Sequence, residues 1–241
     1  MNNSIESYNK SYAKFTPDFL ENTERLHDYL TENNKSLINF FNRYYEQFPE
    51  NDLSRLSLLE LGSGMGGLPT LIGDRFDSYL GIDFSDIAVS IAKKVYPRGE
   101  FKVFDVLSNK KLSNPFDILF DSHLFHCLSF KDDRLKYYSF LKSHMHEKSR
   151  IFIETMVFHK KIKIPASYLF EDGVLYQETD DFKYSPFRSL LTVSEIESEL
   201  KACGFHIDYL YYHSELTINP YEDKLPVDQL PHVLRLSAML R

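Results

Sequence analysis

Four glycines gathered within six residues are the most distinctive feature of the sequence. They lie in the run Glu60-Leu61-Gly62-Ser63-Gly64-Met65-Gly66-Gly67, which follows an apolar segment and precedes a helical pattern over 68–76. A strand that turns sharply into a helix while a nucleotide approaches its backbone needs residues without a Cβ atom, and the start of the helix then offers free N–H groups. The run therefore predicts a binding turn for a nucleotide-like ligand.

Acidic residues close the apolar runs that follow this turn. Asp83 comes twenty-one residues after Gly62, a spacing that suits a carboxylate accepting both hydroxyls of a ribose. Asp105 and Asp121 close the next two runs. Because open α/β sheets bind ligands at the carboxyl ends of their strands, Glu60 and these three acids are expected to ring one site.

A histidine cluster follows Asp121. His123 is the second residue after Asp121, and alternate residues at a strand terminus point the same way, so both could face a reacting group. A histidine at this place suits a general base or an orienting donor near neutral pH, which makes Asp121 and His123 the candidate catalytic residues. His126 and Cys127 are expected to begin the following helix. Their spacing lacks the pattern of a zinc site, so no metal is expected.

The elements that must position these residues are short apolar runs that alternate with longer segments. Expected strands cover 57–61, 79–82, 101–104, 117–120, 151–154, 205–212 and 233–240, and expected helices cover 85–96 and 192–203. Ser85 is a plausible N-cap, and Gly204 ends the last helix. This alternation predicts right-handed crossovers and a doubly wound α/β sheet covered on both faces. Two amphipathic helices are expected within residues 1–50.

Composition narrows the class of protein. The chain has 241 residues, of which 43% are hydrophobic and 26% charged, which fits one large globular domain. The net charge of -7 disfavours nucleic acid as a partner. Two distant cysteines signal no disulfide framework, and no stretch has the length or apolar character of a signal peptide or a membrane span. We therefore expect a cytoplasmic protein without a membrane partner; the sequence leaves its oligomeric state open.

The glycine turn and the acids resemble those of the class I S-adenosylmethionine-dependent methyltransferases. Glu60, Gly62, Gly64 and Gly66 match the turn that holds the methionine part in that family, Asp83 the acid that holds the ribose, and Asp105 the residue that often holds the adenine amine. The run 121–128 looks like the strand-end motif of bacterial small-molecule members. The resemblance covers about 55–160, with a looser match at 192–241. It implies a seven-stranded, mostly parallel sheet with an antiparallel last strand.

The resemblance implies a site for S-adenosylmethionine and a small-molecule acceptor. The expected cofactor-binding residues are Glu60, Gly62, Ser63, Gly64, Gly66, Asp83, Phe84, Asp105, Val106, Asp121 and Tyr12. Residues 1–54 are expected to form a helical extension to the methyltransferase domain at 55–241. Its aromatic rings, including Tyr8 and Tyr12, either close over the sulfonium as a lid, where cation–π attraction holds the charge, or pack on the sheet.

Two long segments within that domain are expected to choose the acceptor. They cover 157–190 and 214–232. The expected substrate-binding residues are His123, Tyr168, Phe170 and Arg188. Aromatic walls with one arginine suit a small acceptor with a ring or a carboxylate. A satellite hydrophobic cluster with Arg188 at its rim is the alternative.

Two other functions remain open. Gly62, Gly64 and Gly67 also satisfy the GxGxxG pattern of nicotinamide-dependent oxidoreductases, and an acid at the position of Asp83 suits that class equally. Glu60 favours the methyltransferase, because the corresponding residue in dinucleotide-binding proteins is usually apolar and a carboxylate attracts the ligand's ammonium group. The other alternative is a cofactor-binding module that has lost catalysis, since a fold does not secure an activity.

Overall fold

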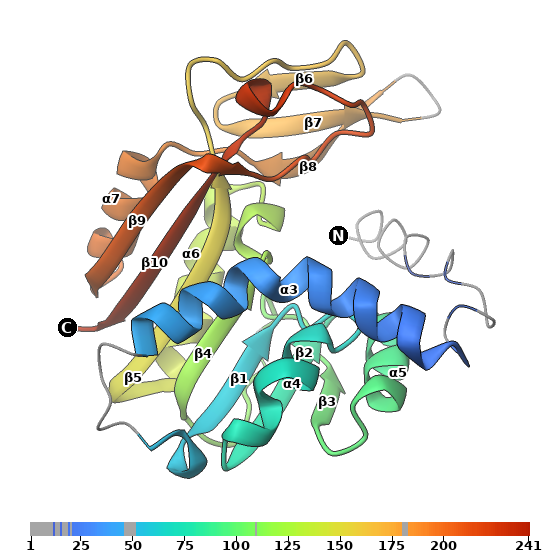
Figure 1. Cartoon of the computed structure of the whole chain (residues 1–241). Coiled ribbons are helices and arrows are strands. Elements are labelled where there is room, and N and C mark those ends of the chain that lie inside the picture. Colours follow the sequence, from blue (N-terminus) through green and yellow to red (C-terminus); the bar gives the residue numbers. More distant parts are fainter. Residues whose placement is uncertain are drawn as a thin grey trace. The chain divides into compact units, whose positions relative to one another are not determined.

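Seven strands join in one sheet, in the order β3-β2-β1-β4-β5-β10-β9 (Figure 1). The structure, a computed structural model, describes residues 12, 15, 19, 21–45, 52–108, 110–179 and 183–241. β1, β2, β3 and β4 run parallel, and β10 runs antiparallel to both β5 and β9. This confirms the predicted α/β fold with an antiparallel last strand. The chain divides into two compact units.

The first unit extends to Lys110 and also contains Phe116–Ser122. Leu58, Leu59 and Leu61 of β1 are fully buried, as expected for a central parallel strand covered on both faces. The elements of this unit are α3 (Thr23–Tyr45), β1 (Ser57–Leu61), α4 (Gly67–Ile72), β2 (Ser78–Asp83), α5 (Asp86–Val95), β3 (Glu100–Val103) and β4 (Phe116–Ser122), with 3₁₀ turns at Leu53–Arg55 and Gly73–Arg75.

Helix α3 packs on the first unit through one apolar face. Near its end, the ring of Phe41 contacts Phe120 of β4, with 5.1 Å between ring centroids. Near its start, Leu26 and Leu30 pack against Met65 of the glycine turn and Ile91 of α5. The spacing of these apolar residues is that of an amphipathic helix. α3 therefore contacts both the sheet and the glycine turn.

The second unit comprises Lys111–Pro115 and all residues from His123 onward. α7 begins with a capping box, in which Thr192 and Glu195 each accept a backbone N–H of the other residue. The elements of this unit are α6 (Lys131–Ser143), β5 (Met145–Val157), β6 (Tyr168–Glu171), β7 (Val174–Glu178), β8 (Tyr184–Ser189), α7 (Val193–Ala202), β9 (Phe205–Thr217) and β10 (His232–Leu240), with 3₁₀ turns at Phe125–Cys127 and Val227–Gln229.

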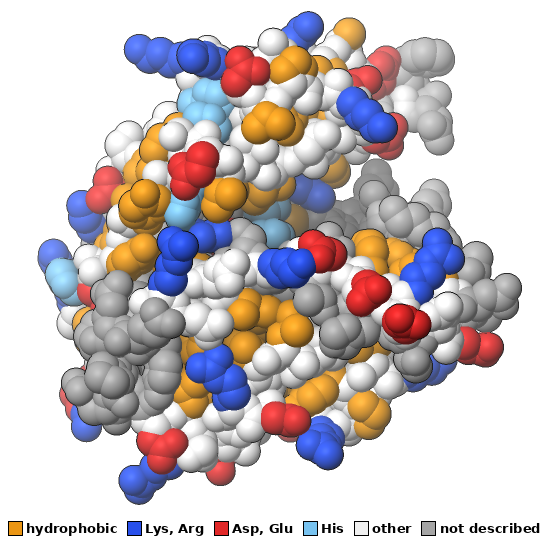
Figure 2. Space-filling model, viewed as in Figure 1, with side chains coloured by type: hydrophobic (Ala, Val, Ile, Leu, Met, Phe, Trp, Pro, Cys, Tyr) orange, Lys and Arg blue, Asp and Glu red, His pale blue; other side chains and the backbone are white. Residues whose placement is uncertain are grey.

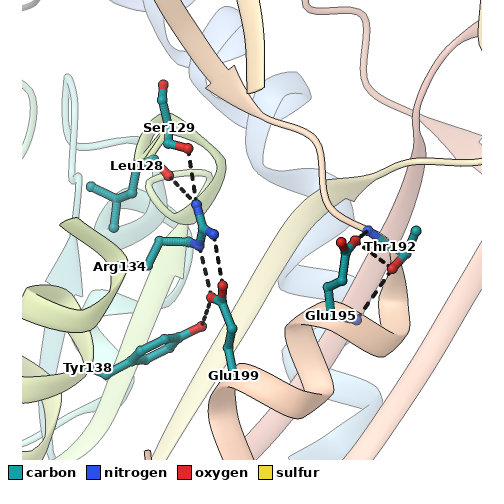
Figure 3. A network of polar contacts seen from close by, with 7 residues as sticks. All are labelled: Leu128, Ser129, Arg134, Tyr138, Thr192, Glu195 and Glu199. Atoms are coloured by element: carbon teal, nitrogen blue, oxygen red, sulfur yellow. Dashed lines mark hydrogen bonds and ion pairs between the residues drawn. The ribbon is translucent and has the colours of Figure 1, made fainter. Parts of the chain in front are cut away.

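Arg134 joins α6 to α7 within the second unit (Figure 3). Its guanidinium donates from Nε and Nη2 to the two carboxylate oxygens of Glu199, at 2.9 and 2.8 Å, and from Nη1 to the carbonyls of Leu128 and Ser129. Tyr138 donates its hydroxyl to the same carboxylate at 3.3 Å. Burial, followed by the charge of Glu199, raises the pKa of Tyr138, so the phenol stays a neutral donor. The ion pair is buried and hydrogen-bonded on both sides.

A separate three-stranded sheet, in the order β6-β7-β8, occupies most of the segment 157–190. Asp172 and Gly173 form the two-residue turn between β6 and β7, with φ of 48° and 76°. Two positive φ values identify a type I′ hairpin turn, whose twist suits antiparallel strands. The sequence analysis expected no strands here.

Several other elements differ from expectation in extent. β5 starts at Met145 rather than at residue 151, and β9 continues to Thr217, which shortens the loop expected from residue 214. α4 ends at Ile72, where a 3₁₀ turn takes over, and His126 and Cys127 lie in a 3₁₀ turn that precedes α6. α3 is one continuous helix, and most of the segment expected to form an earlier helix lies outside the described residues.

Charged side chains of both signs are interspersed over the described surface that Figure 2 shows. Among the described residues, no helix combines the length and the apolar character needed to cross a membrane.

Candidate functional site

The glycine turn adopts a backbone conformation that requires glycine. Gly62, Gly64 and Gly66 have φ of 71°, 50° and 78°, in the left-handed region that L side chains disfavour. The N–H groups of Gly62 and Ser63 both donate to the Ile82 carbonyl, at 2.9 and 3.0 Å, which ties the turn to β2. A Cβ atom on Gly66 would lie 3.1 Å from the Cβ of Ala92, so this glycine also permits close packing of α5.

Asp83 connects this turn to the start of α5. Its Oδ2 accepts the N–H of Gly64 at 2.9 Å, and its Oδ1 accepts the N–H of Ser85 at 2.9 Å. Burial raises the pKa of Asp83, and the N–H bonds from Ser85, Gly64 and Phe84 lower it by less, so the net shift is upward. The carboxylate is therefore placed at the turn at some cost in desolvation.

Glu60 is buried in β1 and accepts a hydrogen bond from the hydroxyl of Tyr79. Gly81 lies opposite Glu60 in the register of β1 and β2, and a Cβ atom on Gly81 would lie 2.8 Å from the Tyr79 hydroxyl oxygen. Burial, followed by the charge of Glu60, raises the pKa of Tyr79 well above its ordinary value, so the phenol remains a donor. The partner observed for the Glu60 carboxylate is thus Tyr79; the contact with a ligand ammonium group stays a prediction.

The other acids lie at the ends of neighbouring strands. Asp121 is fully buried and lies opposite Leu61, the last residue of β1. Asp105 follows β3 and accepts the N–H of Leu107 at 2.8 Å, with buried Val106 beside it. The N–H of Phe104 donates to the Asp83 carbonyl at 2.8 Å, which holds the end of β3 beside the end of β2, where half-buried Phe84 follows. Side chains from the ends of β2, β3 and β4 are thereby brought to one edge of the sheet, beside the turn.

Two further residues mark the turn itself. Ser63 is 5% exposed, and within the described part of the chain its buried hydroxyl oxygen has no hydrogen-bond partner. The Tyr12 hydroxyl lies 3.1 Å from the position that a Cβ atom on Gly64 would take, and its ring packs on the cluster that contains Met65. Tyr8 lies outside the described residues. The structure thus brings Tyr12 to the same place as the glycines.

His123 lies in the second unit, one residue beyond β4. Its φ of 68° is positive, so the alternation of side chains along β4 does not fix its direction. Its side chain is 39% exposed, and Nε2 lies 2.8 Å from Oε1 of buried Glu154. The ring of His126 lies 5.7 Å from that of His123, centroid to centroid, and its Nδ1 is 3.3 Å from the Thr155 hydroxyl.

His126 is held neutral by its surroundings. Burial lowers its pKa well below the ordinary value, and the charges of His123 and Arg188 add to the shift. A buried neutral imidazole of this kind serves packing and hydrogen bonding.

The three remaining sequence-predicted residues lie on the small sheet. Tyr168 is buried in a core cluster with Leu175, Tyr221 and Leu230. Phe170 stacks on Phe158, with 5.2 Å between centroids and 10° between ring planes. Arg188 is half-buried, with its guanidinium carbon 3.9 Å from the centroid of the Phe187 ring. Tyr168 is therefore built into the core, whereas Phe170 and Arg188 are only partly covered.

Sequence reasoning missed Glu154 and Tyr79. Glu154 closes an expected strand, as Asp83, Asp105 and Asp121 do, so the same rule of acids at strand ends could have found it. Nothing in the sequence signals that Tyr79 contacts Glu60, because that contact depends on the register between two strands.

Solved structures share this fold across most of the chain. An S-adenosylmethionine-dependent methyltransferase from Methanosarcina mazei superposes with a TM-score of 0.63 at 16% identity, covering 78% of this chain and 93% of that one. Another, from Clostridium acetobutylicum, gives 0.58 at 17%, covering 82% and 89%. The glycopeptide N-methyltransferase MtfA, solved with S-adenosylmethionine, gives 0.56 at 15%, covering 82% and 92%. No family model and no curated protein matches the sequence. The fold is that of the class I S-adenosylmethionine-dependent methyltransferases.

Proposed function

We propose that the chain is an S-adenosylmethionine-dependent methyltransferase that acts on a small molecule. The observation that carries this proposal is the junction of Gly64 and Asp83, where a carboxylate lies directly against a glycine turn of left-handed conformation. Solved proteins of this fold bind the cofactor, among them MtfA and DhpI, which was solved with S-adenosylhomocysteine. The residues at the turn fit the same group.

Each side of the proposed cofactor has a matching part in the first unit. The glycines offer a surface without Cβ atoms, and the buried hydroxyl of Ser63 supplies a polar group suited to the methionine part. The Asp83 carboxylate supplies hydrogen-bond acceptors for the ribose. For the adenine, Asp105 supplies a carboxylate and Val106 an apolar wall. The proposed cofactor-binding residues are Glu60, Gly62, Ser63, Gly64, Gly66, Asp83, Phe84, Asp105, Val106, Asp121 and Tyr12.

The chemistry requires little from the protein beyond placement and exclusion of water. When bound, S-adenosylmethionine supplies a methyl carbon that a nucleophile attacks in line with the departing sulfur. Positive charge disperses during this displacement, so apolar surroundings favour the transition state. The ring of Tyr12, next to Gly64, is suited to cover the sulfonium, and Asp121 and His123 are the proposed catalytic residues.

We propose that the acceptor carries an aromatic ring or a carboxylate. Phe170, in its stack with Phe158, offers an aromatic surface, and the guanidinium of Arg188 is the cation on the same sheet. Release of S-adenosylhomocysteine, measured over aromatic carboxylic acids and their methyl esters, tests this. We expect S-adenosylhomocysteine to be released faster with the acids than with the esters, and we expect Arg188→Gln to remove this difference. Equal rates with acids and esters would rule out the carboxylate.

Replacement of Gly64 tests the proposed cofactor site. A Cβ atom on Gly64 would occupy a left-handed backbone position 3.1 Å from the Tyr12 hydroxyl, at the surface proposed to face the methionine part. We expect Gly64→Ala to weaken binding of S-adenosylmethionine at least about 10-fold by isothermal titration calorimetry, because about 1.4 kcal/mol of binding energy corresponds to that factor.

Gly204 provides a matched control. Its φ of 86° imposes a similar backbone strain on alanine, but a Cβ atom there meets nothing within 4 Å. Gly204→Ala should lower stability while leaving the dissociation constant unchanged. Wild-type affinity in Gly64→Ala, or no binding by the wild-type protein, would contradict the proposal.

A further inference from the structure

We propose that Glu154, clamped by Arg235, is a positioning residue that holds His123 in the tautomer whose Nδ1 accepts a proton. The inference rests on the proposed function, in which His123 lies at the acceptor. It assigns roles to two buried residues that the sequence analysis did not single out.

Glu154 and Arg235 form a buried pair across two neighbouring strands. They lie directly opposite each other in the antiparallel register of β5 and β10. The Nε of Arg235 donates to Oε2 of Glu154 at 2.6 Å, and their side chains are only 6% and 2% exposed. Oε1 of the same carboxylate lies 2.8 Å from Nε2 of His123. One carboxylate oxygen thus serves the arginine, and the other serves the histidine.

The charge of this carboxylate fixes the proton on the histidine. Burial raises the pKa of Glu154, but the hydrogen bonds and charges of His123 and Arg235 lower that pKa by more than burial raises it. The net shift is downward, and the carboxyl group stays ionised. An ionised carboxylate only accepts hydrogen bonds. Nε2 of His123 must therefore carry a proton, and in the neutral ring Nδ1 keeps the lone pair.

Arg235 is itself fixed from its other side. Its Nη1 lies 3.4 Å from Nε2 of His213, and Nδ1 of His213 lies 2.7 Å from Oε1 of Glu215. Because a guanidinium only donates, Nε2 of His213 accepts and its Nδ1 donates to Glu215. Donors and acceptors match along the whole series from His123 to Glu215. Such a series orients each member through the next.

The backbone of His123 also points to a role beyond packing. A φ of 68° is uncommon for a residue with a side chain and costs on the order of 1 kcal/mol. Two titratable groups lie against it: the His126 ring, 5.7 Å away between centroids, and the Cys127 thiol, which donates to the His123 carbonyl at 3.3 Å. The charge of Arg188 acts on the His126 ring. Strain of this kind persists where surrounding contacts hold it, and here the ring is held by Glu154 and the backbone carbonyl by the Cys127 thiol.

Nδ1 of His123 is the proposed acceptor of the proton that methyl transfer releases. The acceptor heteroatom bonds to the methyl carbon with its lone pair, and the carbon–sulfur bond breaks with its electrons passing to sulfur. The acceptor's proton passes to Nδ1 of His123. The resulting imidazolium is stabilised by the Glu154 carboxylate at Nε2.

The tautomer of His123 can be read directly by long-range ¹⁵N–¹H correlation NMR of the full chain, with His123→Asn assigning the signals. We expect the neutral ring of the wild-type protein to be the Nε2–H tautomer. In Glu154→Gln, the single amide oxygen must still accept from Arg235, so the NH₂ group turns toward His123. The tautomer should then switch to Nδ1–H. A purely structural role for Glu154 would not move this signal.

Two variants complete the test. Glu154→Gln combined with Arg235→Met frees the amide to turn back and should restore the Nε2–H form, whereas Glu171→Gln, at an exposed position on β6, should change nothing. An Nδ1–H tautomer in the wild-type protein, or no switch in folded Glu154→Gln, overturns the proposal. If the variants do not fold, the wild-type spectrum alone decides. Calorimetry with S-adenosylmethionine on the same sample tests the proposed function separately, since binding does not depend on the tautomer.

Discussion

The buried hydroxyl of Ser63 has a consequence of opposite sign for stability and for binding. A buried polar atom without a partner costs about 1–3 kcal/mol, and Ser63 Oγ is such an atom within the described chain. Ser63→Ala should therefore raise the free energy of unfolding by about 1 kcal/mol, measured by urea denaturation. If the hydroxyl bonds the cofactor, the same change should weaken S-adenosylmethionine binding about 5-fold.

Ser237 separates the two effects. Its hydroxyl is also buried without a partner among the described residues, but it lies in β10. Ser237→Ala should stabilise the protein to a similar extent and leave the affinity for S-adenosylmethionine unchanged. Equal affinity in the two variants would remove Ser63 from the cofactor site.

The raised pKa of Asp83 predicts a pH dependence. At pH values between 3.8, the ordinary pKa of an aspartate, and the raised pKa of folded Asp83, the folded state holds a proton that the unfolded state has lost. The protonated Asp83 side chain therefore adds to the free energy of unfolding below pH 3.8, and this contribution is lost as the pH rises through the pKa of Asp83 in the folded state. The affinity for S-adenosylmethionine should have the opposite pH dependence, because the ribose hydroxyls need the ionised carboxylate. Affinity should fall as the pH is lowered through that same pKa.

Calorimetric titrations at a series of pH values check this, with Asp83→Asn as the comparison. The variant should bind S-adenosylmethionine more weakly, and the part of the pH dependence that belongs to Asp83 should disappear. An unchanged pH profile in Asp83→Asn would assign the dependence to another group.

At the residue scale, the sequence predicts which residues gather but not which atoms they contact. Glycines and acids at strand ends follow from local spacing, and Gly64 and Asp83 do meet. The bonds of Glu60 to Tyr79 and of His123 to Glu154 depend on strand register and on one left-handed residue. Those features arise from the packing of the whole fold, so a single sequence does not reveal them.

At the scale of the elements, a buried ion pair joins α6 to α7. Arg134 and Glu199 have side chains only 5% and 12% exposed, and each is bonded to further partners. Removing one member leaves a buried charge unpaired, which typically costs about 3–5 kcal/mol. We expect Arg134→Met to lower the free energy of unfolding by about 3 kcal/mol in urea denaturation.

The exposed pair of Lys201 and Glu197 on α7 is the control. The two are four residues apart, with side chains 55% and 34% exposed, so solvent screens their attraction. Lys201→Met should change stability by no more than about 0.5 kcal/mol. A similar loss in both variants would show that the buried pair has no special role.

The small sheet contains one turn that the sequence could have predicted and one irregularity that it could not. Asp172-Gly173 between Phe170 and Val174 is the strongest short-range signal for a hairpin, and the structure has that turn. In the pairing of β7 with β8, the register shifts between Leu175 and Tyr176, and no comparable signal in the sequence marks this shift. β5 begins before its apolar run, because the residues from His146 to Lys148 are half-buried or exposed, so hydrophobicity does not mark its start.

At the scale of the whole molecule, the alternation of elements predicts a parallel α/β sheet, but it predicts neither the order of the strands nor the compact units. The structure divides the chain between Ser122 and His123, inside the motif that carries both proposed catalytic residues. The division expected at residues 54 and 55 rests on composition and stays a prediction. Contacts between distant residues define compact units, and one sequence does not contain them.

Stability of the whole molecule distinguishes the methyltransferase from a nicotinamide oxidoreductase. A ligand at 100 times its dissociation constant adds about 2.7 kcal/mol to the free energy of unfolding. For a chain of 241 residues, each kcal/mol corresponds to a shift in melting temperature of about 2–4 °C. S-adenosylmethionine should therefore raise the melting temperature by about 5–10 °C in differential scanning calorimetry, and NADH should leave it unchanged.

Gly64→Ala makes this measurement specific to the glycine turn. The variant should lose at least about half of the shift that S-adenosylmethionine produces, since a dissociation constant raised about 10-fold lowers the added stability from about 2.7 to about 1.4 kcal/mol at the same ligand concentration. A shift with NADH but not with S-adenosylmethionine would reassign the turn to a dinucleotide, because its left-handed glycines and the carboxylate of Asp83 suit that ligand's ribose equally well. No shift with either ligand would contradict both cofactor assignments, and the acids at the strand ends would then need another explanation.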